Sequence, residues 1–193
     1  MKKLIPLIVI FSIAAIVMLY ISSIEHKLVD KKTLKAGFSL IDTDGKPTSD
    51  QDFKNNYKLV FFGFTHCPMV CPTGLTTISN VIEELKEKTD IPISYFFITV
   101  DPERDTPEVL KEHLSNFNPS IHGLTGSEKQ IEQVKKNFKA FSKKGEDDGS
   151  GNYMVDHSSY IYFMDPNNEY AAHFNYDMKV EKIVKKIIKS ISK

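Results

Sequence analysis

The side chains best suited to chemistry in this sequence are two cysteines, Cys67 and Cys71, with three residues between them. Each is followed by a proline. A residue before proline avoids helical backbone, so we expect Cys67 in a loop and Cys71 at the N-cap of a helix that begins at Pro72. The dipole and free N–H groups of a helix N-terminus lower the pKa of a thiol there. Two such thiols could form a disulfide, bind a soft or borderline metal such as Cu(I) or Zn(II), or pack as small buried apolar groups.

A histidine near the cysteines would favour the metal site. We expect His113 to be exposed in the middle of a helix and His122 to lie in a glycine-containing turn, whereas His157 leads directly into a strand. The residues alone select none of them, because a surface or capping role suits each. The six candidates are His26, His66, His113, His122, His157 and His173.

The chain has 25 basic residues, of which 24 are lysines and only Arg104 is an arginine. A single arginine indicates a need for its planar, bidentate guanidinium. Asp101, Glu103 and Asp105 are its local partners, and together they are expected to form a rigid loop beside the cysteines. The alternative is a plain surface ion pair, worth about 0–1 kcal/mol.

These residues fall at the ends of predicted strands. Continuous apolar runs at 58–65 and 93–100 are typical of strands buried on both faces, and the cysteines follow the first run. The carboxyl ends of such strands are where open α/β sheets bind ligands. The other expected strands are one at 38–41 and a hairpin of 160–164 and 170–174. Helices are expected after the cysteines, from Pro107, behind Ser127 and from about 177. The helix after the cysteines has Leu75, Ile78, Ile82 and Leu85 on one face, and the helix behind Ser127 has Ile131, Val134, Phe138 and Phe141 on one face. Their alternation predicts an α/β fold with a central mixed sheet flanked by helices.

Composition limits the function classes. The 25 acidic residues balance the 25 basic ones, which argues against a nucleic-acid partner. Two cysteines are too few for a disulfide-stapled scaffold or a four-cysteine zinc site, and an apolar content of 41% is enough for a real core.

Residues 4–24 form 21 consecutive positions without a charge, which is long enough to span a bilayer. The run is longer than a signal-peptide core and has no small-x-small cleavage motif, so we expect a retained transmembrane anchor. The predicted organisation is an anchor at 1–24, a linker at 25–36 and one domain at 37–193.

Three motifs together resemble the Sco/SenC family of membrane-anchored, copper-binding assembly factors for cytochrome c oxidase. They are Phe62-Gly-Phe-Thr-His-Cys-Pro-Met-Val-Cys-Pro72, Thr99-Val-Asp-Pro-Glu-Arg-Asp-Thr-Pro107 and Val155-Asp-His157, and the similarity covers nearly all of 36–193. The resemblance implies a thioredoxin-like fold and one copper ion bound by Cys67, Cys71 and His157. It also implies copper delivery to the binuclear copper site of oxidase subunit II, or reduction of the acceptor cysteines there. Two thiolates and an imidazole favour Cu(I), and similar sets also hold Cu(II).

Two positions depart from the family pattern, which usually has acidic residues where this chain has Met69 and Thr73. The loop is therefore less negative, which affects partner choice and redox potential. We expect a metallochaperone rather than an enzyme, with the alternative of a thiol–disulfide oxidoreductase that reduces the acceptor cysteines or acts in redox signalling. A peroxidase is disfavoured because Thr65 lies only two residues before Cys67, not three.

The expected partners are oxidase subunit II, an upstream copper donor, a thiol reductant and the membrane itself. Two lysines precede the anchor and no arginine-rich presequence is present. The predicted location is therefore a bacterial inner membrane. Lysines lie on both flanks of the anchor, and the family resemblance favours the orientation that puts the domain in the periplasm.

Overall fold

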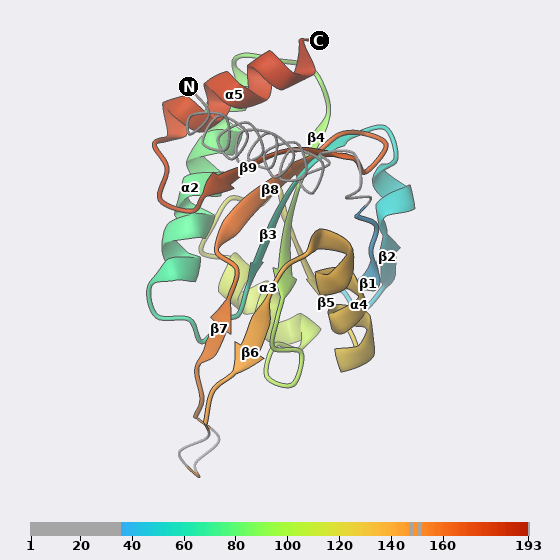
Figure 1. The fold of residues 1–193 in the computed structure, drawn as a ribbon, viewed down its shortest axis with the longest axis vertical. Helices are drawn as coiled ribbons and strands as arrows, with labels where there is room; N and C mark the ends of the chain where they lie inside the picture. The colour runs from blue at the N-terminus through green and yellow to red at the C-terminus, as the bar shows by residue number, and fades with distance from the viewer. Residues whose placement is uncertain (1–35, 147–148, 150–151, 193) are drawn as a thin grey trace, which may run out of the picture. The chain divides into compact units, whose positions relative to one another are not determined.

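The computed structural model describes residues 36–146, 149 and 152–192 (Figure 1). The predicted anchor, and the predicted linker apart from its last residue, lie outside these residues. Among the described helices, none is both long enough and apolar enough to cross a membrane.

Seven strands form one mixed sheet in the order β2-β1-β5-β4-β3-β8-β9. Strands β3, β4 and β5 are parallel, whereas β1, β2, β8 and β9 join by antiparallel pairing. The predicted α/β class with a mixed central sheet is confirmed. The elements are β1 (Ser39–Asp42), β2 (Pro47–Ser49), η1 (Asp50–Phe53), β3 (Tyr57–Gly63), α2 (Val70–Lys86), β4 (Ile93–Thr99), α3 (Pro107–Leu114), β5 (Ile121–Thr125), α4 (Glu128–Phe138), β6 (Ser142–Lys144), β7 (Val155–His157), β8 (Tyr160–Met164), β9 (Tyr170–Asn175) and α5 (Val180–Ile191).

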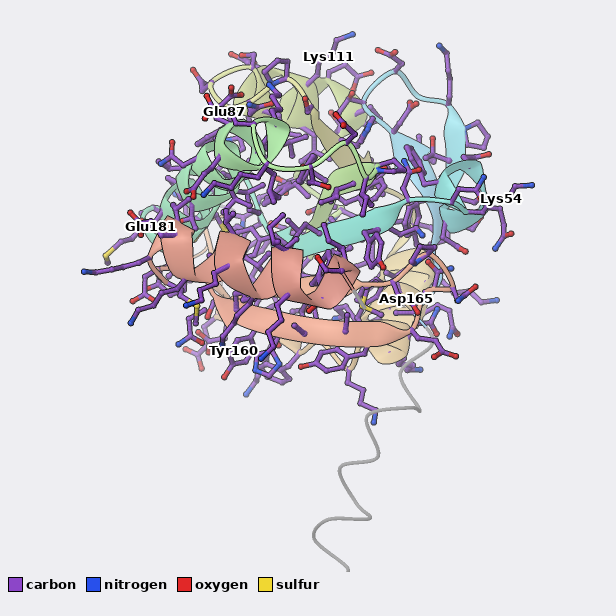
Figure 2. All side chains as sticks on the ribbon, turned by 90° about the horizontal axis from the view of Figure 1, so that it is seen from above. Lys54, Glu87, Lys111, Tyr160, Asp165 and Glu181 are labelled. Atoms are coloured by element: carbon purple, nitrogen blue, oxygen red, sulfur yellow. The ribbon has the colours of Figure 1, made fainter. Side chains whose placement is uncertain are left out.

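The two central strands are buried on both faces, as their apolar runs predict. Successive side chains of a strand point to opposite faces. Phe61 therefore contacts α2 at Gly74, and Phe62 contacts Phe138 of α4 on the other face. Helix α2 packs against α5. Figure 2 shows side chains of both charges, such as Lys54 and Glu181, projecting outward on different sides, in keeping with the balanced composition.

The structure corrects three sequence predictions. Residues 121–125 form a strand, so His122 lies in β5 and not in a turn. Helix α4 ends at Phe138 because Lys139 adopts left-handed backbone with φ 51°, and Phe141, expected on its apolar face, is 57% exposed. Helix α5 begins at Val180, three residues later than expected.

Strands β6 and β7 form a separate two-stranded hairpin that the sequence did not predict. It projects from the end of the domain away from α5 (Figure 1). Its pairing sets Ser142 opposite His157 and Lys144 opposite Val155. The hairpin therefore carries His157, and its attachment to the domain decides where that histidine lies.

Candidate metal centre

The cysteines lie where β3 ends and α2 begins. Cys67 is in the connecting loop, as predicted, but the N-cap of α2 is Met69, so Cys71 is the second residue of the helix and not its N-cap. Pro72 is tolerated there because the first N–H groups of a helix have no partner within it. The free N–H of Cys71 instead donates to Cys67 Sγ, 3.3 Å away.

His157 completes a compact group with the cysteines. The Sγ atoms of Cys67 and Cys71 and a ring nitrogen of His157 all lie within 4.8 Å of one another. Cys71 Sγ is 3.6 Å from His157 Nε2. On the other side of the ring, His157 Nδ1 is 3.0 Å from the carbonyl oxygen of Ser158. Since a carbonyl only accepts, Nδ1 carries a proton, and Nε2 is the ring nitrogen that faces the sulfurs.

The two thiols have opposite acidities. The hydrogen bond from the Cys71 side chain lowers the pKa of Cys67 to about 4, against the effect of burial. The pKa of Cys71 is raised, first by that same bond to Cys67 and then by its complete burial. The prediction that the helix N-terminus lowers the pKa of Cys71 is therefore wrong, because donating to a neighbouring thiolate stabilises its protonated form. Without metal, the pair holds one thiolate and one thiol.

The donor atoms fit a soft metal ion. Two sulfurs and one imidazole nitrogen suit Cu(I), which accepts few and soft ligands, whereas structural zinc sites usually have four ligands. Among the described residues, no carboxylate belongs to the group. The same two sulfurs are also close enough for dithiol–disulfide chemistry.

Asp105 fastens the cysteine loop to the end of β4. Its carboxylate accepts hydrogen bonds from the Thr65 backbone N–H at 3.1 Å, the Thr65 hydroxyl at 2.6 Å and the Thr99 hydroxyl at 2.6 Å. Asp105 is fully buried, and burial raises the pKa of its carboxyl against the effect of these bonds. It was expected beside Arg104 as an ion-pair partner, but its hydrogen bonds go to the threonines.

Arg104 pairs with Asp101 instead. Its Nε donates to Asp101 Oδ2 at 2.5 Å, and the two side chains are only 16% and 4% exposed, so this is not a plain surface ion pair. The guanidinium lies 3.6 Å from the ring centroid of Tyr153 and 5.8 Å from that of Phe64. Phe64 also meets the His157 ring edge-on at 5.7 Å. The predicted supporting loop thus reaches the metal-binding group through aromatic rings.

The remaining histidines lie elsewhere. His66 is exposed, with Nδ1 3.0 Å from the Thr65 hydroxyl. His113 is not exposed as expected, since it packs against aromatic rings of the core, and burial lowers its pKa. His122 packs on Phe96, and His26 lies outside the described residues.

Tyr153 is the functional candidate that the sequence reasoning missed. It is 7% exposed, and its hydroxyl donates to Asp101 Oδ1 at 2.7 Å. The signal was present, because Tyr153 is an aromatic residue at the end of a polar segment, four positions before His157. No local pattern shows that it contacts a loop about fifty residues away in the chain.

The comparisons with known proteins agree with this geometry. An SCO2-like protein of Rickettsia prowazekii is 44% identical over 156 residues, covering 80% of this chain and 76% of that protein. The solved structure of Arabidopsis thaliana ScoI with copper bound has 33% identity and a TM-score of 0.77, covering 83% of this chain and 99% of that one. Bradyrhizobium japonicum ScoI with copper bound has 36% identity and a TM-score of 0.74, covering 82% and 99%.

These similarities confirm the thioredoxin-like fold that the motifs implied. The SCO1/SenC family model matches residues 26–192, which is most of the chain and includes all three motifs. Together with the Rickettsia relative, this match shows that the chain belongs to the SCO1/SenC family.

Proposed function

We propose that this protein binds one copper ion through Cys67 Sγ, Cys71 Sγ and His157 Nε2 and takes part in assembly of cytochrome c oxidase. The observation that carries the proposal is the convergence of these three soft donors within 4.8 Å. The copper-bound Arabidopsis and Bradyrhizobium relatives support it. The acceptor we propose is the binuclear copper site of oxidase subunit II.

Copper is the cargo of this site. Cys67 meets the ion as a thiolate, whereas Cys71 releases its proton as the metal binds. His157 needs no tautomer change, because the Ser158 carbonyl already holds the proton on Nδ1. Since protons compete for all three donors, copper affinity falls at acid pH.

Copper stoichiometry tests the site. The reduced protein should bind one copper, and Cys67→Ser, Cys71→Ser or His157→Ala should each remove tight binding. His66→Ala is the matched control, because His66 neighbours Cys67 but lies outside the group of three. Wild-type affinity in the His157→Ala protein would refute the three-ligand site.

The cellular role has its own test. We propose that residues 1–24 anchor the protein in a bacterial inner membrane with its domain in the periplasm, where a copper donor and a thiol reductant supply it. Deletion of the gene should lower oxidase activity and oxidase copper content, and added copper should restore both. Normal oxidase in the deletion strain contradicts the assembly role.

A thiol–disulfide reductase is a second candidate, because the site pairs a low-pKa thiolate with a protonated thiol. The Cys67 thiolate attacks one sulfur of an acceptor disulfide and forms a mixed disulfide, and the first acceptor thiolate leaves. Cys71, once deprotonated, attacks Cys67 Sγ and releases the second acceptor thiolate. The acceptor gains two electrons, and the chain is left with a Cys67–Cys71 disulfide for an external thiol reductant to reduce. Metal-free protein that reduces the acceptor disulfide, with copper absent after reducing purification, would favour this candidate.

A further inference from the structure

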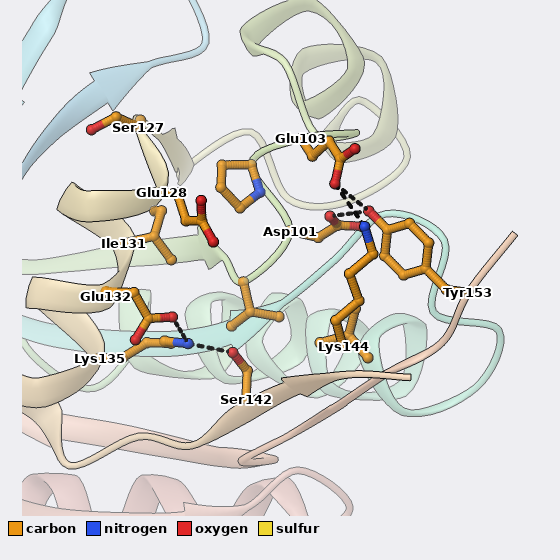
Figure 3. A pocket seen from close by; sticks show the side chains of 14 residues that line it. Asp101, Glu103, Ser127, Glu128, Ile131, Glu132, Lys135, Ser142, Lys144 and Tyr153 are labelled. Carbon is orange, nitrogen blue, oxygen red and sulfur yellow. Dashed lines mark hydrogen bonds and ion pairs between the residues drawn. The ribbon is translucent and has the colours of Figure 1, made fainter. Parts of the chain in front are cut away.

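The β6–β7 hairpin, which carries His157, lines one side of a cavity. The cavity has a volume of about 490 Å³ and lies between the hairpin, the loop at 101–103 and the first turns of α4 (Figure 3). Val155 of β7 and Ser142 and Lys144 of β6 line it. A packed core would hold the hairpin by close apolar contact over its whole surface. Beside the cavity, the hairpin is therefore held in part by contacts at its two edges.

Polar contacts at one edge join the start of the hairpin to α4 and to the segment after β7. Lys135 Nζ donates to Ser142 Oγ at 2.6 Å. Phe141 and Ser158 exchange two hydrogen bonds, from Phe141 N to Ser158 Oγ at 2.8 Å and from Ser158 N to Phe141 O at 2.9 Å. These bonds hold the chain on the C-terminal side of His157.

Tyr153 makes the contacts at the other edge, on the N-terminal side of His157. Its hydroxyl donates to Asp101 Oδ1 at 2.7 Å, and its ring lies against two cations, with the Arg104 guanidinium 3.6 Å and the Lys144 ammonium 3.8 Å from the centroid. Lys144 also donates to Glu103 Oε2 at 2.8 Å. Figure 3 shows the Tyr153 hydroxyl and Lys144 converging on the two carboxylates.

The loop that receives Tyr153 is itself rigid. Asp101 is buried, and its carboxylate accepts from Arg104 through one oxygen and from Tyr153 through the other. Arg104 lies against Phe64, whose ring in turn meets His157 edge-on. A shift of Tyr153 therefore reaches His157 both along β7 and through the Arg104–Phe64 contact.

We propose that Tyr153 is a positioning residue for His157: it holds β7 against the loop at 101–104 and so sets how long copper stays bound. This inference rests on the proposed copper function. The Tyr153 hydroxyl and the Tyr153 ring each contribute to keeping His157 Nε2 directed at the sulfurs. Loss of the hydroxyl or of the ring makes β7 more mobile, so that His157 is away from the copper ion for part of the time and copper is released faster.

The test uses Tyr153→Phe, which removes only the hydroxyl, and Tyr153→Leu, which also removes the ring. The same two substitutions at Tyr95 are matched controls, because Tyr95 is 8% exposed, as buried as Tyr153, but lies in β4. The first readout is the rate of amide hydrogen exchange of Gly145 in the metal-free protein. The Gly145 N–H donates to Met154 O at 2.8 Å across the hairpin. The second is the rate at which an excess of a Cu(I) chelator removes copper.

We expect Tyr153→Phe to speed both processes about tenfold, the effect of one hydrogen bond to a charged group. We expect Tyr153→Leu to speed them about 30-fold or more, since two cation–ring contacts are lost as well. The Tyr95 variants should change neither. In a His157→Ala background, which has lost tight binding, the weak copper affinity left by the two sulfurs should not depend on Tyr153 in a competition titration.

Two results would overturn the inference: unchanged copper release in both Tyr153 variants, whether or not hairpin exchange becomes faster, or an equal Tyr153 effect in the His157→Ala background. In each case wild-type copper binding stands and the proposed function survives. A wild-type protein that binds no copper overturns the proposed function and this inference with it. Denaturant unfolding of every variant confirms that the comparison is between folded proteins.

Discussion

Gly63, the last residue of β3, leaves no room for a side chain beside Cys71. A Cβ at this position would lie 2.7 Å from Cys71 Sγ and 2.6 Å and 2.9 Å from two ring carbons of Phe97. Gly63 pairs with Thr99 of β4, and its carbonyl accepts from the Val100 N–H at 2.8 Å, so its backbone is held in place. Gly63→Ala must therefore displace the Cys71 sulfur or the Phe97 ring.

The size of the effect follows from these distances. Unstrained contacts between heavy atoms are about 3.5–4.0 Å, so relief requires a shift of roughly 1 Å. Overpacking of this kind costs about 1–3 kcal/mol of stability. Metal–ligand distances tolerate only about 0.2 Å, so displacement of the Cys71 sulfur should lower copper affinity by at least about 10–100-fold, the range seen when a ligand loses its support.

Gly123→Ala is the matched control. Its Cβ would meet Leu114 Cδ1 at 2.5 Å and Thr43 Cγ2 at 2.8 Å, an equally severe overlap with no sulfur nearby. Denaturant unfolding should show that both variants lose stability, whereas a Cu(I) competition titration should show lost affinity only in Gly63→Ala. Wild-type copper affinity in Gly63→Ala, or an equal loss in Gly123→Ala, would refute the reasoning.

Three further predictions concern the residues around the site. Because the pKa of Cys67 is lowered to about 4, the rate of its alkylation by iodoacetamide should be nearly independent of pH between about 6 and 8. Cys71, whose pKa is raised, should stay unmodified, as peptide mass spectrometry can measure. A tenfold rise in the alkylation rate of Cys67 per pH unit contradicts this prediction. Asp105→Ala leaves the Thr65 N–H and hydroxyl without their acceptor and should lower the free energy of unfolding by about 2–4 kcal/mol in urea, so a loss below about 0.5 kcal/mol contradicts it. Arg104→Lys loses the planar contact with its aromatic neighbours and should weaken copper retention, which an unchanged competition titration would disprove.

Local patterns were sufficient for the elements that frame the site. The apolar runs of β3 and β4 and the apolar stripe of α2 predicted two buried strands and the helix between them. Strand β5 was missed because His122 and Gly123 interrupt its apolar run, and it becomes a strand through pairing with β4 and β1. Strands β6 and β7 are three residues each, too short for a periodic signal.

The sequence by itself determined the two thiols of the candidate site and, through three ordered motifs, the family to which the chain belongs, and the family resemblance implied His157 as the third donor. Only the tertiary structure decided which thiol is ionised, because acidity depends on which sulfur accepts the hydrogen bonds and which is sealed from water. It also brought His157 to Cys71 across 86 positions of the chain. That contact depends on β8 pairing with β3 and on Tyr153 meeting Asp101, and such non-local contacts have no signature in local periodicity.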